Sequence, residues 1–178
     1  MSETCDQFVD RYGGIYEHSA WVAEETYATA ADISDANNLA IIFASCVNEA
    51  SYDRKLTLIR AHPDLAGKAA IAGNLTEEST AEQSSAGIEQ CTPEEYKQFQ
   101  SLNKQYKEKF GFPFVMAVRH SNRSDILRAF ARRLQNDKET EFATAIGEIH
   151  KIAKLRLEGI SKRRSREALS ATLTMDKP

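Results

Sequence analysis

The stretch from Glu141 to Ile160, EFATAIGEIHKIAKLRLEGI, decides the fold class of this 178-residue chain. Its apolar side chains recur at intervals of three, four or seven residues, which places them on one face of an α-helix. The positions on this face are Phe142, Ile146, Ile149, Ala153 and Ile160. We therefore predict a long helix that begins near Lys138 and reaches at least Ile160.

Arg156 interrupts this apolar stripe, because it lies between Ala153 and Ile160 on the same face. A guanidinium on the inward face of a helix needs an anion or several hydrogen-bond acceptors. Its partner could be a carboxylate of the protein or a group of a bound ligand, and the sequence leaves both open. We favour the ligand, and we expect the guanidinium to be partly unsatisfied and hydrated when no ligand is bound.

Helical patterns continue through most of the chain. Residues 36–60 have helical spacing with a bend expected near Ala50–Ser51, and another helix is predicted from Ser124 to about Asn136. The sequence therefore predicts an all-α fold, a single-domain bundle of about seven to nine helices. We place the domain at residues 1–160 and treat 161–178, SKRRSREALSATLTMDKP, as a basic tail that extends the last helix or frays. Such a run is usually solvated, and its charge suits the negative end of a helix dipole.

Two stretches have the signature of a helix start. Thr92, Pro93 and Glu95 provide a cap residue, a proline at the first helical position and the acid of a capping box. That helix should run to about Phe110 and end at Gly111. The stretch STAE (79–82) also fits a capping box, followed by a short helix to about Gln90.

The stretch FGFPFVMAV (110–118) has a proline and no helical stripe, so we predict a buried extended segment. LIRAHPDLAGKAA (58–70) contains a second interruption, where His62 directly precedes Pro63. The residue before a proline is forced out of the helical region, so His62 lies at a stiff corner. It is either the end of a helix or a reactive group that can titrate near neutral pH, and Gly67 would let the backbone approach a ligand closely. His18, His120 and His150 show no comparable constraint.

Glu82 has two interpretations. It is either the acid of the capping box that starts at Ser79, or a group that binds a ligand at the first turn of a helix. The hydroxyl, carboxylate and amide groups of Ser79, Thr80, Glu82 and Gln83 would suit a polar, urea-like small molecule.

The composition is that of an ordinary globular protein. With 42% hydrophobic residues, 28% charged residues and a net charge of -3, it gives no sign of nucleic-acid binding. Cys5, Cys46 and Cys91 have neither metal-ligand nor redox-motif spacing, and no metal-protease, P-loop, dinucleotide-binding or serine-hydrolase motif occurs. Apolar runs are too short to cross a bilayer, and the N-terminus MSETCDQF lacks the features of a signal peptide. We expect a cytoplasmic protein without a metal, a cofactor, or membrane or nucleic-acid partners.

The tripeptide His62-Pro63-Asp64 also occurs in the J domains of co-chaperones, which are binding modules. A J domain continues with a basic loop and a long amphipathic helix, whereas LAGKAAIAGN follows here, so this alternative fits poorly. Over about residues 7–160, the sequence instead resembles the OHCU (2-oxo-4-hydroxy-4-carboxy-5-ureidoimidazoline) decarboxylases of the urate pathway. Five blocks carry the resemblance in order: GGIYEHSAWVAE, AHPDLAGKAA, STAEQSSAG, FGFPFVMAV and EFATAIGEIHKIAKLRLEGI. Ala20 departs from the proline of many relatives, which concerns a turn and not the chemistry.

The resemblance implies an all-α, cofactor-free and usually dimeric enzyme, which converts OHCU to (S)-allantoin with loss of carbon dioxide. Its catalytic residues correspond to His62 and Glu82. Its substrate-binding positions correspond to Pro63, Ser79, Thr80, Ala81, Gln83, Phe114, Val115, Met116, Ala117, Val118 and Arg156. Hydrolysis of a ureido compound is a second possible reaction class, but it would need a metal or an activated nucleophile, for which no motif is present. The group that delivers the stereospecific proton is not identified by the sequence.

Overall fold

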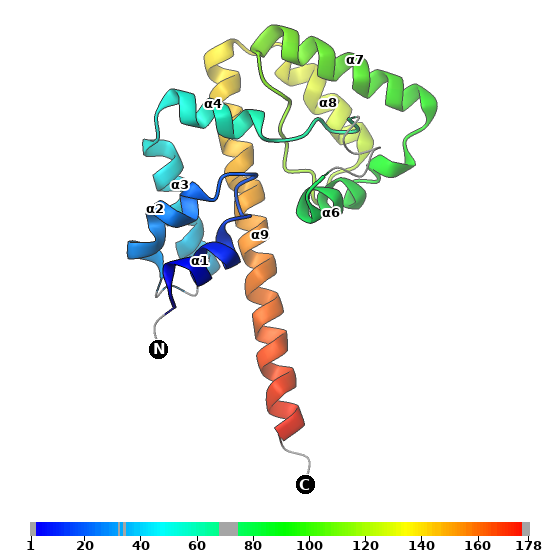
Figure 1. The fold of residues 1–178 in the computed structure, drawn as a ribbon. Coiled ribbons are helices and arrows are strands. Elements are labelled where there is room, and N and C mark those ends of the chain that lie inside the picture. The colour runs from blue at the N-terminus through cyan, green and yellow to red at the C-terminus, as the bar shows by residue number, and fades with distance from the viewer. Residues whose placement is uncertain (1–2, 32, 34, 68–74, 176–178) are drawn as a thin grey trace. The chain divides into compact units, whose positions relative to one another are not determined.

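The structure, a computed structural model, describes residues 3–31, 33, 35–67 and 75–175, apart from the side chains of 168, 169 and 171–175. This part of the chain contains α-helices, one short 3-10 helix and no strand (Figure 1). The helices are α1 (Cys5–Tyr12), α2 (Trp21–Ala30), α3 (Ala36–Glu49), α4 (Tyr52–Arg60), α6 (Glu77–Ser85), η1 (Ile88–Gln90), α7 (Pro93–Phe110), α8 (Arg123–Arg133) and α9 (Lys138–Met175). The predicted all-α fold is confirmed. The part of LAGKAAIAGN that follows Gly67 lies outside the described residues.

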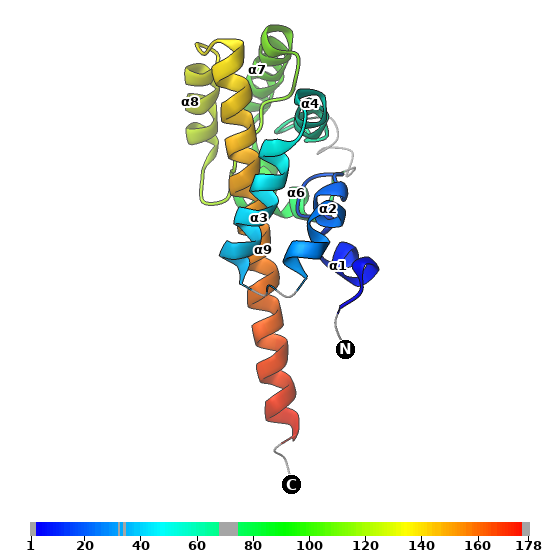
Figure 2. The same cartoon turned by 90° about the vertical axis from the view of Figure 1, so that its left-hand side faces the viewer.

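The contacts of the chain group it into two compact units. The terminal unit comprises Met1–Ala50 and His150–Pro178, and the central unit comprises Ser51–Ile149. Helix α9 contributes to both and is unbroken in both views (Figures 1 and 2). The predicted start near Lys138 is confirmed, and the tail is a helical extension as far as Met175. The proposed division of the chain at residue 160 stays a prediction.

The basic residues of the tail are solvated, as expected: Lys162, Arg163, Arg164 and Arg166 are exposed. The expected interaction with the helix dipole is wrong, since α9 has no basic residue in its last turn. The dipole acts on charges only within the first and last turns of a helix. Within the described residues, every helix is either too short or too polar to cross a membrane.

Aromatic side chains form much of the core of the terminal unit. Phe8 of α1 is fully buried, and its ring centroid lies 4.8 Å from that of Tyr12 and 6.2 Å from that of Phe43 on α3. Tilted and edge-to-face pairs of this kind add to the free energy of apolar burial. The core therefore joins α1 to α3, and α2 packs against both helices.

The predicted bend between α3 and α4 is confirmed. Ala50 has an extended backbone with φ -64° and ψ 154°, and the Ser51 side chain accepts a hydrogen bond from the Arg54 N–H. An extended residue followed by a serine cap ends one helix and starts the next.

The core of the central unit is built around the buried ring of Tyr106 on α7. Its centroid lies 4.6 Å from that of Phe110, 5.2 Å from Phe114 and 6.1 Å from Phe130 on α8. Phe114 belongs to the predicted extended segment, whose first residue, Phe110, is the last residue of α7. Residues 111–118 contain no helix or strand and are largely buried, so the predicted burial is confirmed.

Capping residues in the sequence predicted several helix ends of the central unit. The capping box of Thr92 and Glu95 is present, and Gly111 ends α7 with a left-handed φ of 82°, as predicted. Helix α8 begins one residue before the predicted Ser124, because Asn122 forms a capping box with Asp125, and it ends at Arg133 rather than near Asn136.

Candidate functional site

His62 lies just beyond the C-terminal end of α4, where Pro63 prevents the helix from continuing. Its ring is 7% exposed, and its Nδ1 lies 2.9 Å from the Leu58 carbonyl oxygen. Because a carbonyl can only accept a hydrogen bond, Nδ1 carries the proton, and the neutral ring has its basic lone pair on Nε2. The fold thus fixes both the orientation and the tautomer of the ring.

The loop after His62 turns sharply. Ala66 adopts a left-handed φ of 50°, which is costly for a residue with a Cβ. A Cβ on Gly67 would lie 2.7 Å from the Asp64 Cβ and 2.9 Å from the Asp64 oxygen. A Cβ at this position would therefore collide with Asp64 of the same loop, which is sufficient reason for a glycine here. The suggested close approach of a ligand stays a prediction.

Three amide side chains hold this loop. The Ala66 N–H donates to Gln83 Oε1 on α6 at 3.1 Å, and the Ala66 carbonyl accepts from Gln100 Nε2 on α7 at 2.6 Å. Asn103 Nδ2 donates to the Leu65 carbonyl at 2.8 Å. Sequence reasoning missed Gln100 and Asn103. The signal was present, because Asn103 lies on the buried stripe of α7 between Phe99 and Tyr106.

The capping-box interpretation of Ser79 to Glu82 is wrong. Thr76 caps α6, and its hydroxyl accepts a hydrogen bond from the Ser79 N–H at 3.2 Å. Glu82 is therefore the sixth residue of the helix and cannot be the acid of its capping box. The structure therefore rules out a capping box as the reason for a glutamate at position 82.

Glu82 shares a helix face with two buried residues. Ser79, Glu82 and Gln83 are spaced three and four residues apart, which places them on one side of α6. Gln83 binds Ala66 from this helix, so α6, which carries Glu82, is hydrogen-bonded to the loop beginning at His62. Thr80 and Gln83 also line a cavity of about 460 Å³, which Ala66 and Tyr96 border from other segments. Neither His62 nor Glu82 is among its described lining residues.

The Phe114–Val118 segment is held from two helices. Arg133 Nη1 on α8 donates to the Val115 carbonyl at 2.6 Å, and the Ala117 N–H donates to Glu148 Oε2 on α9 at 2.9 Å. The Phe114 ring stacks on Phe130 with centroids 3.7 Å apart. The guanidinium of Arg133 covers the Phe114 ring at 4.4 Å.

Within the central unit, α4, the helix that precedes His62, is hydrogen-bonded to Gly111 at the start of the extended segment. Arg60, two residues before His62, donates from Nε and Nη2 to the Gly111 carbonyl at 3.1 and 3.0 Å. Two of the segments that carry predicted substrate-binding positions are thus hydrogen-bonded close to His62 in the chain: α6 through Gln83 to Ala66, and residues 110–118 through Gly111 to Arg60.

A buried ionic network that the sequence did not predict supports Arg133. Its Nε and Nη2 lie 2.7 and 2.5 Å from Glu141 Oε1. Tyr106 donates to the same carboxylate, and burial is the main cause that raises the pKa of its hydroxyl. Arg133 continues the buried stripe of α8 after Ile126 and Phe130, so its position in the sequence carried the same signal as Arg156.

Arg156 belongs to the terminal unit and is paired inside the protein. Its Nη1 lies 2.9 Å from Glu17 Oε2, 3.2 Å from the Gly14 carbonyl and 3.5 Å from the Ile15 carbonyl. Arg156 is 6% exposed and Glu17 is 2% exposed. The expectation of a partly unsatisfied, hydrated guanidinium is wrong, because Glu17 of the block GGIYEHSAWVAE supplies a buried counter-charge.

His150, for which the sequence shows no constraint comparable with that of His62, is held by two side chains in the structure. Its Nε2 lies 3.1 Å from Asn48 Oδ1, which can only accept, so Nδ1 is the acceptor for the Tyr16 hydroxyl at 2.9 Å. Burial lowers the pKa of His150 and raises that of Tyr16. His150 is thus a neutral ring that bridges two polar side chains.

Among the described residues, no group of three His, Cys, Asp or Glu side chains is arranged as metal ligands would be. Cys5, Cys46 and Cys91 are half-buried, and none of them forms a disulfide within the described residues.

The model of the OHCU decarboxylase family matches residues 2–158 of the chain. The chain belongs to the OHCU decarboxylase family. A relative from Haloferax volcanii, a 2-oxo-4-hydroxy-4-carboxy-5-ureidoimidazoline decarboxylase, is 44% identical over 152 residues, which are 85% of this chain and 88% of the relative. The resemblance seen in the five sequence blocks is thereby confirmed.

Two solved structures have the same fold. The crystal structure of an (S)-allantoin synthase is 35% identical and matches with a TM-score of 0.70, over 89% of this chain and 51% of that chain. A crystal structure of an OHCU decarboxylase in the presence of (S)-allantoin matches with a TM-score of 0.68 over 83% of this chain and 95% of that chain. At 21% identity, this second likeness concerns the fold alone.

Proposed function

We propose that this chain decarboxylates OHCU to (S)-allantoin with release of carbon dioxide, as a step of urate degradation. Membership of the OHCU decarboxylase family supports the reaction. The observation that carries the proposal is the hydrogen bond between Gln83 and Ala66, which joins α6, the helix of Glu82, to the loop that begins at His62. Both residues belong to the central unit, and their roles in proton transfer and charge control are part of the proposal.

The substrate itself can accept the electrons of the reaction. Its carboxylate is on a carbon that also bears a hydroxyl and adjoins a C=N bond. When the bond to the carboxylate breaks, its electron pair forms a C=C bond, and the electrons of the C=N bond move to nitrogen, which takes up a proton. The enol then returns to a carbonyl as a proton adds to the neighbouring carbon on one face. No external electron sink is needed, so the protein has to supply orientation, proton transfer and charge control.

His62 is the proposed proton carrier for the substrate hydroxyl. Its Nδ1–H is held by the Leu58 carbonyl, so the neutral ring accepts a proton at Nε2. A side chain at a fixed position and in one tautomer meets the geometric requirement of general acid–base catalysis.

Glu82 is the proposed acceptor for N–H groups of the substrate ring or ureido chain. Its negative charge would also lie near the carboxylate of the substrate. Repulsion between the two negative charges would be relieved when that carboxylate leaves as neutral carbon dioxide. Since Thr76 caps α6, this carboxylate is not needed to start the helix.

Met116 is the proposed backbone contact of the extended segment. The Val115 carbonyl and the Ala117 N–H are bound by Arg133 and Glu148. In an extended chain, neighbouring residues direct their polar groups to opposite edges. The N–H and carbonyl of Met116 are therefore directed away from these two partners, where they could pair with an amide edge of the substrate ring.

The other substrate contacts stay proposals that rest on the family. Gln83 uses Oε1 for Ala66, so its Nε2 is the end that could donate to a substrate carbonyl. The further proposed contacts are Pro63, Ser79, Thr80, Ala81, Phe114, Val115, Ala117, Val118 and Arg156. For Arg156, the pairing with Glu17 means that any substrate contact would add to a bond already made.

We also propose a homodimer in the cytoplasm, as the family resemblance implies. Cysteines without disulfides are the usual state in a reducing compartment, and none of Cys5, Cys46 and Cys91 forms a disulfide within the described residues. Light scattering after size-exclusion chromatography would test the dimer, and a monomer mass at working concentration would contradict it.

The reaction is tested by adding the protein to freshly generated OHCU and following circular dichroism. Spontaneous decay gives racemic allantoin, so an optical signal reports the enzyme alone. We expect rapid formation of the (S)-enantiomer. A folded protein that yields no optical signal above spontaneous decay would contradict the proposal.

His62→Asn should fold normally and lose about 10²–10⁴ in turnover, the usual contribution of a general acid or base. His120→Asn is the matched control, since His120 is exposed and has a left-handed φ of 71° that asparagine tolerates. Stereospecific turnover and melting temperature are measured on the same samples. Near-normal turnover of His62→Asn would leave His62 as the end of a helix and nothing more.

A further inference from the structure

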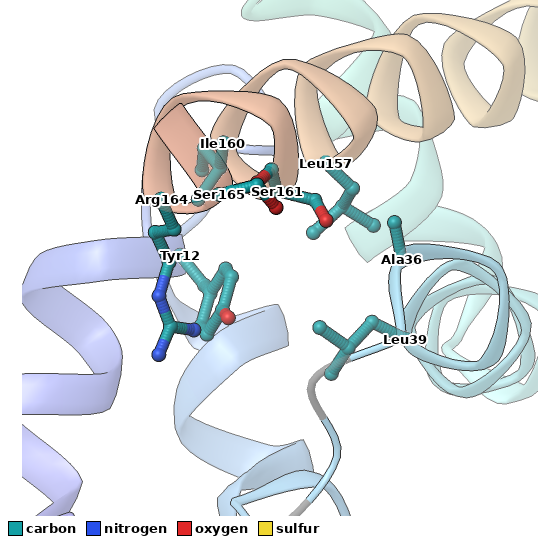
Figure 3. A pocket seen from close by; sticks show the side chains of 8 residues that line it. All are labelled: Tyr12, Ala36, Leu39, Leu157, Ile160, Ser161, Arg164 and Ser165. Carbon is teal, nitrogen blue, oxygen red and sulfur yellow. The ribbon is translucent and has the colours of Figure 1, made fainter. Parts of the chain in front are cut away.

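The terminal unit contains a cavity of about 340 Å³ between α1, α3 and the C-terminal part of α9 (Figure 3). One part of its lining is apolar: Ala36 and Leu39 from α3, and Leu157 and Ile160 from α9. This volume is near the lower limit of small-molecule sites, so it suits a compact ligand. The apolar residues would bury the body of that ligand.

Among the described residues, the polar part of the lining can donate hydrogen bonds and includes no acidic side chain. It consists of Tyr12 from α1 and of Ser161, Arg164 and Ser165 from α9. Arg164 has no ion pair or hydrogen bond to the residues that the structure describes. The formal charge of the described lining is therefore positive.

Tyr12 is the buried member of this polar set. It is 4% exposed, and its hydroxyl makes no hydrogen bond to any part of the chain that the structure describes. Figure 3 shows the hydroxyl directed into the space that Leu39 and Leu157 border. The ring of Tyr12 is buried while its hydroxyl stays accessible from the cavity, and a tyrosine whose polar end meets a cavity is ready to bind a group placed there.

We propose that this cavity binds a small monocarboxylate with a compact apolar body. The planar guanidinium of Arg164 and the Tyr12 hydroxyl would bind the two carboxylate oxygens, and Ser161 would add a third donor. A single guanidinium matches a single negative charge, whereas a phosphate dianion would be left with uncompensated charge beside four apolar side chains.

The site does not rest on the proposed decarboxylase activity. The family match ends at residue 158, before Ile160, Ser161, Arg164 and Ser165. These residues therefore belong to the part of α9 for which the family offers no role. Arg156 lies two helical turns before Arg164 on the same helix, so a ligand bound here would contact the helix that carries the Arg156–Glu17 pair.

The test uses the full-length protein and benzoate, with benzyl alcohol as a neutral probe of similar shape. Binding is followed by NMR titration of the backbone amides, with Leu39 and Ser161 as reporters. We expect benzoate to bind more tightly than benzyl alcohol and to shift these two amides. Arg164→Gln should weaken benzoate binding about tenfold or more, the effect of losing a charge-assisted hydrogen bond, and leave benzyl alcohol unchanged.

Two further variants make the result specific. Tyr12→Phe keeps the buried ring and removes only the hydroxyl, so it should weaken benzoate several-fold. Arg163→Gln is the matched control, because Arg163 is exposed, carries the same charge and does not line the cavity. Benzoate should shift the same amides in the presence of saturating (S)-allantoin.

Several outcomes would overturn the proposal. The first is that the Leu39 and Ser161 amides do not shift with benzoate up to about 10 mM. The second is that benzoate and benzyl alcohol bind equally tightly. The third is that Arg164→Gln and Arg163→Gln weaken benzoate binding equally. Displacement of benzoate by (S)-allantoin would assign the binding to the proposed substrate site instead. None of these measurements depends on turnover, so the result for His62→Asn does not affect them. The carboxylate site can therefore be disproved independently of the decarboxylase activity.

Discussion

In each of the two units, the structure describes an arginine buried against a buried glutamate, and the two pairs are held differently. In the central unit, Arg133 lies 2.5 to 2.7 Å from Glu141 and also binds the Val115 carbonyl. In the terminal unit, Nη1 of Arg156 is 2.9 Å from Glu17 and 3.2 to 3.5 Å from two carbonyls. The first pair is the tighter one, and it holds the segment proposed to bind the substrate. The comparison shows that a buried arginine on an apolar stripe indicates a need for an anion, but not whether that anion is the protein or a ligand.

The largest effect is expected for Arg133→Met. Removing one partner of a buried ion pair leaves Glu141 as an uncompensated charge and should lower the free energy of unfolding by about 3–5 kcal/mol. Because the Val115 carbonyl loses its donor, turnover of the folded fraction should fall as well. Urea titration and stereospecific turnover would measure both.

Arg132→Met is the matched control for this prediction, since Arg132 is exposed on the same turn of α8. Comparable stability of the two variants would mean that the Arg133–Glu141 pair does not hold the central unit together.

For Arg156→Met we expect a smaller decrease in the free energy of unfolding, about 3 kcal/mol. The distances from Arg156 Nη1 to its oxygen partners are longer than those between Arg133 and Glu141. The sequence pattern had suggested no loss at all, on the assumption that the ligand was the main partner. If Arg156 also contacts the substrate, binding of (S)-allantoin to the folded variant weakens by about 1.5–3 kcal/mol. Calorimetry measures the binding and urea titration the stability, with Lys154→Met on the exposed face of α9 as the control. If Arg156→Met is destabilised but binds (S)-allantoin as tightly as the wild type, Arg156 pairs with Glu17 and does not contact the ligand.

His150 provides a pH test that concerns the terminal unit alone. Burial lowers the pKa of its ring, so the unfolded chain binds a proton more readily than the folded protein. Its contribution to stability is therefore present above the ordinary histidine pKa of 6.5 and is lost as the pH falls below it. The melting temperature should drop between about pH 7 and pH 5.

His150→Gln should make that decline less steep, whereas His18→Asn, at an exposed histidine, should leave it unchanged. The same slope in the wild type and in His150→Gln would show that other groups cause the acid sensitivity.

The smallest effect on stability is expected for Glu82→Gln. Glutamate and glutamine have similar helix propensities and similar hydrogen-bonding reach, and Glu82 is not the acid of a capping box, so the change should cost less than about 1 kcal/mol. Turnover should nevertheless fall by about 10²-fold or more, because the charge is lost. Glu78→Gln in the exposed first turn of α6 is the control. Full turnover of Glu82→Gln would exclude a catalytic charge at this position.

Sequence reasoning succeeded where a structure is decided by neighbouring residues. The capping box at Thr92, the glycine end of α7 and the bend at Ser51 all follow from a few adjacent side chains. It failed at α6, where Thr76 and Ser79 are both possible caps. The extended backbone of Thr76, with ψ 158°, decides between them, and the sequence does not reveal that angle.

Long-range partners could not be predicted at all. Periodicity showed that Arg156 needs an anion, but Glu17 is 139 residues away and only the fold brings them together. The same holds for Ala66 and its partners Gln83 and Gln100, which come from two other helices. The family resemblance supplied the substrate, because no physical pattern within the chain identifies a particular ring.

The left-handed backbone of Ala66 has a consequence for protein engineering. An L-residue in this conformation costs roughly 1–2 kcal/mol relative to glycine, and the bonds from Gln83 and Gln100 hold it there. A thermostability screen would therefore favour Ala66→Gly, which relieves the strain. The same change would give the backbone four residues after His62 more freedom, so selection for heat resistance would act against a well-placed histidine. Directed evolution of this scaffold should select for turnover at every round and not for stability first.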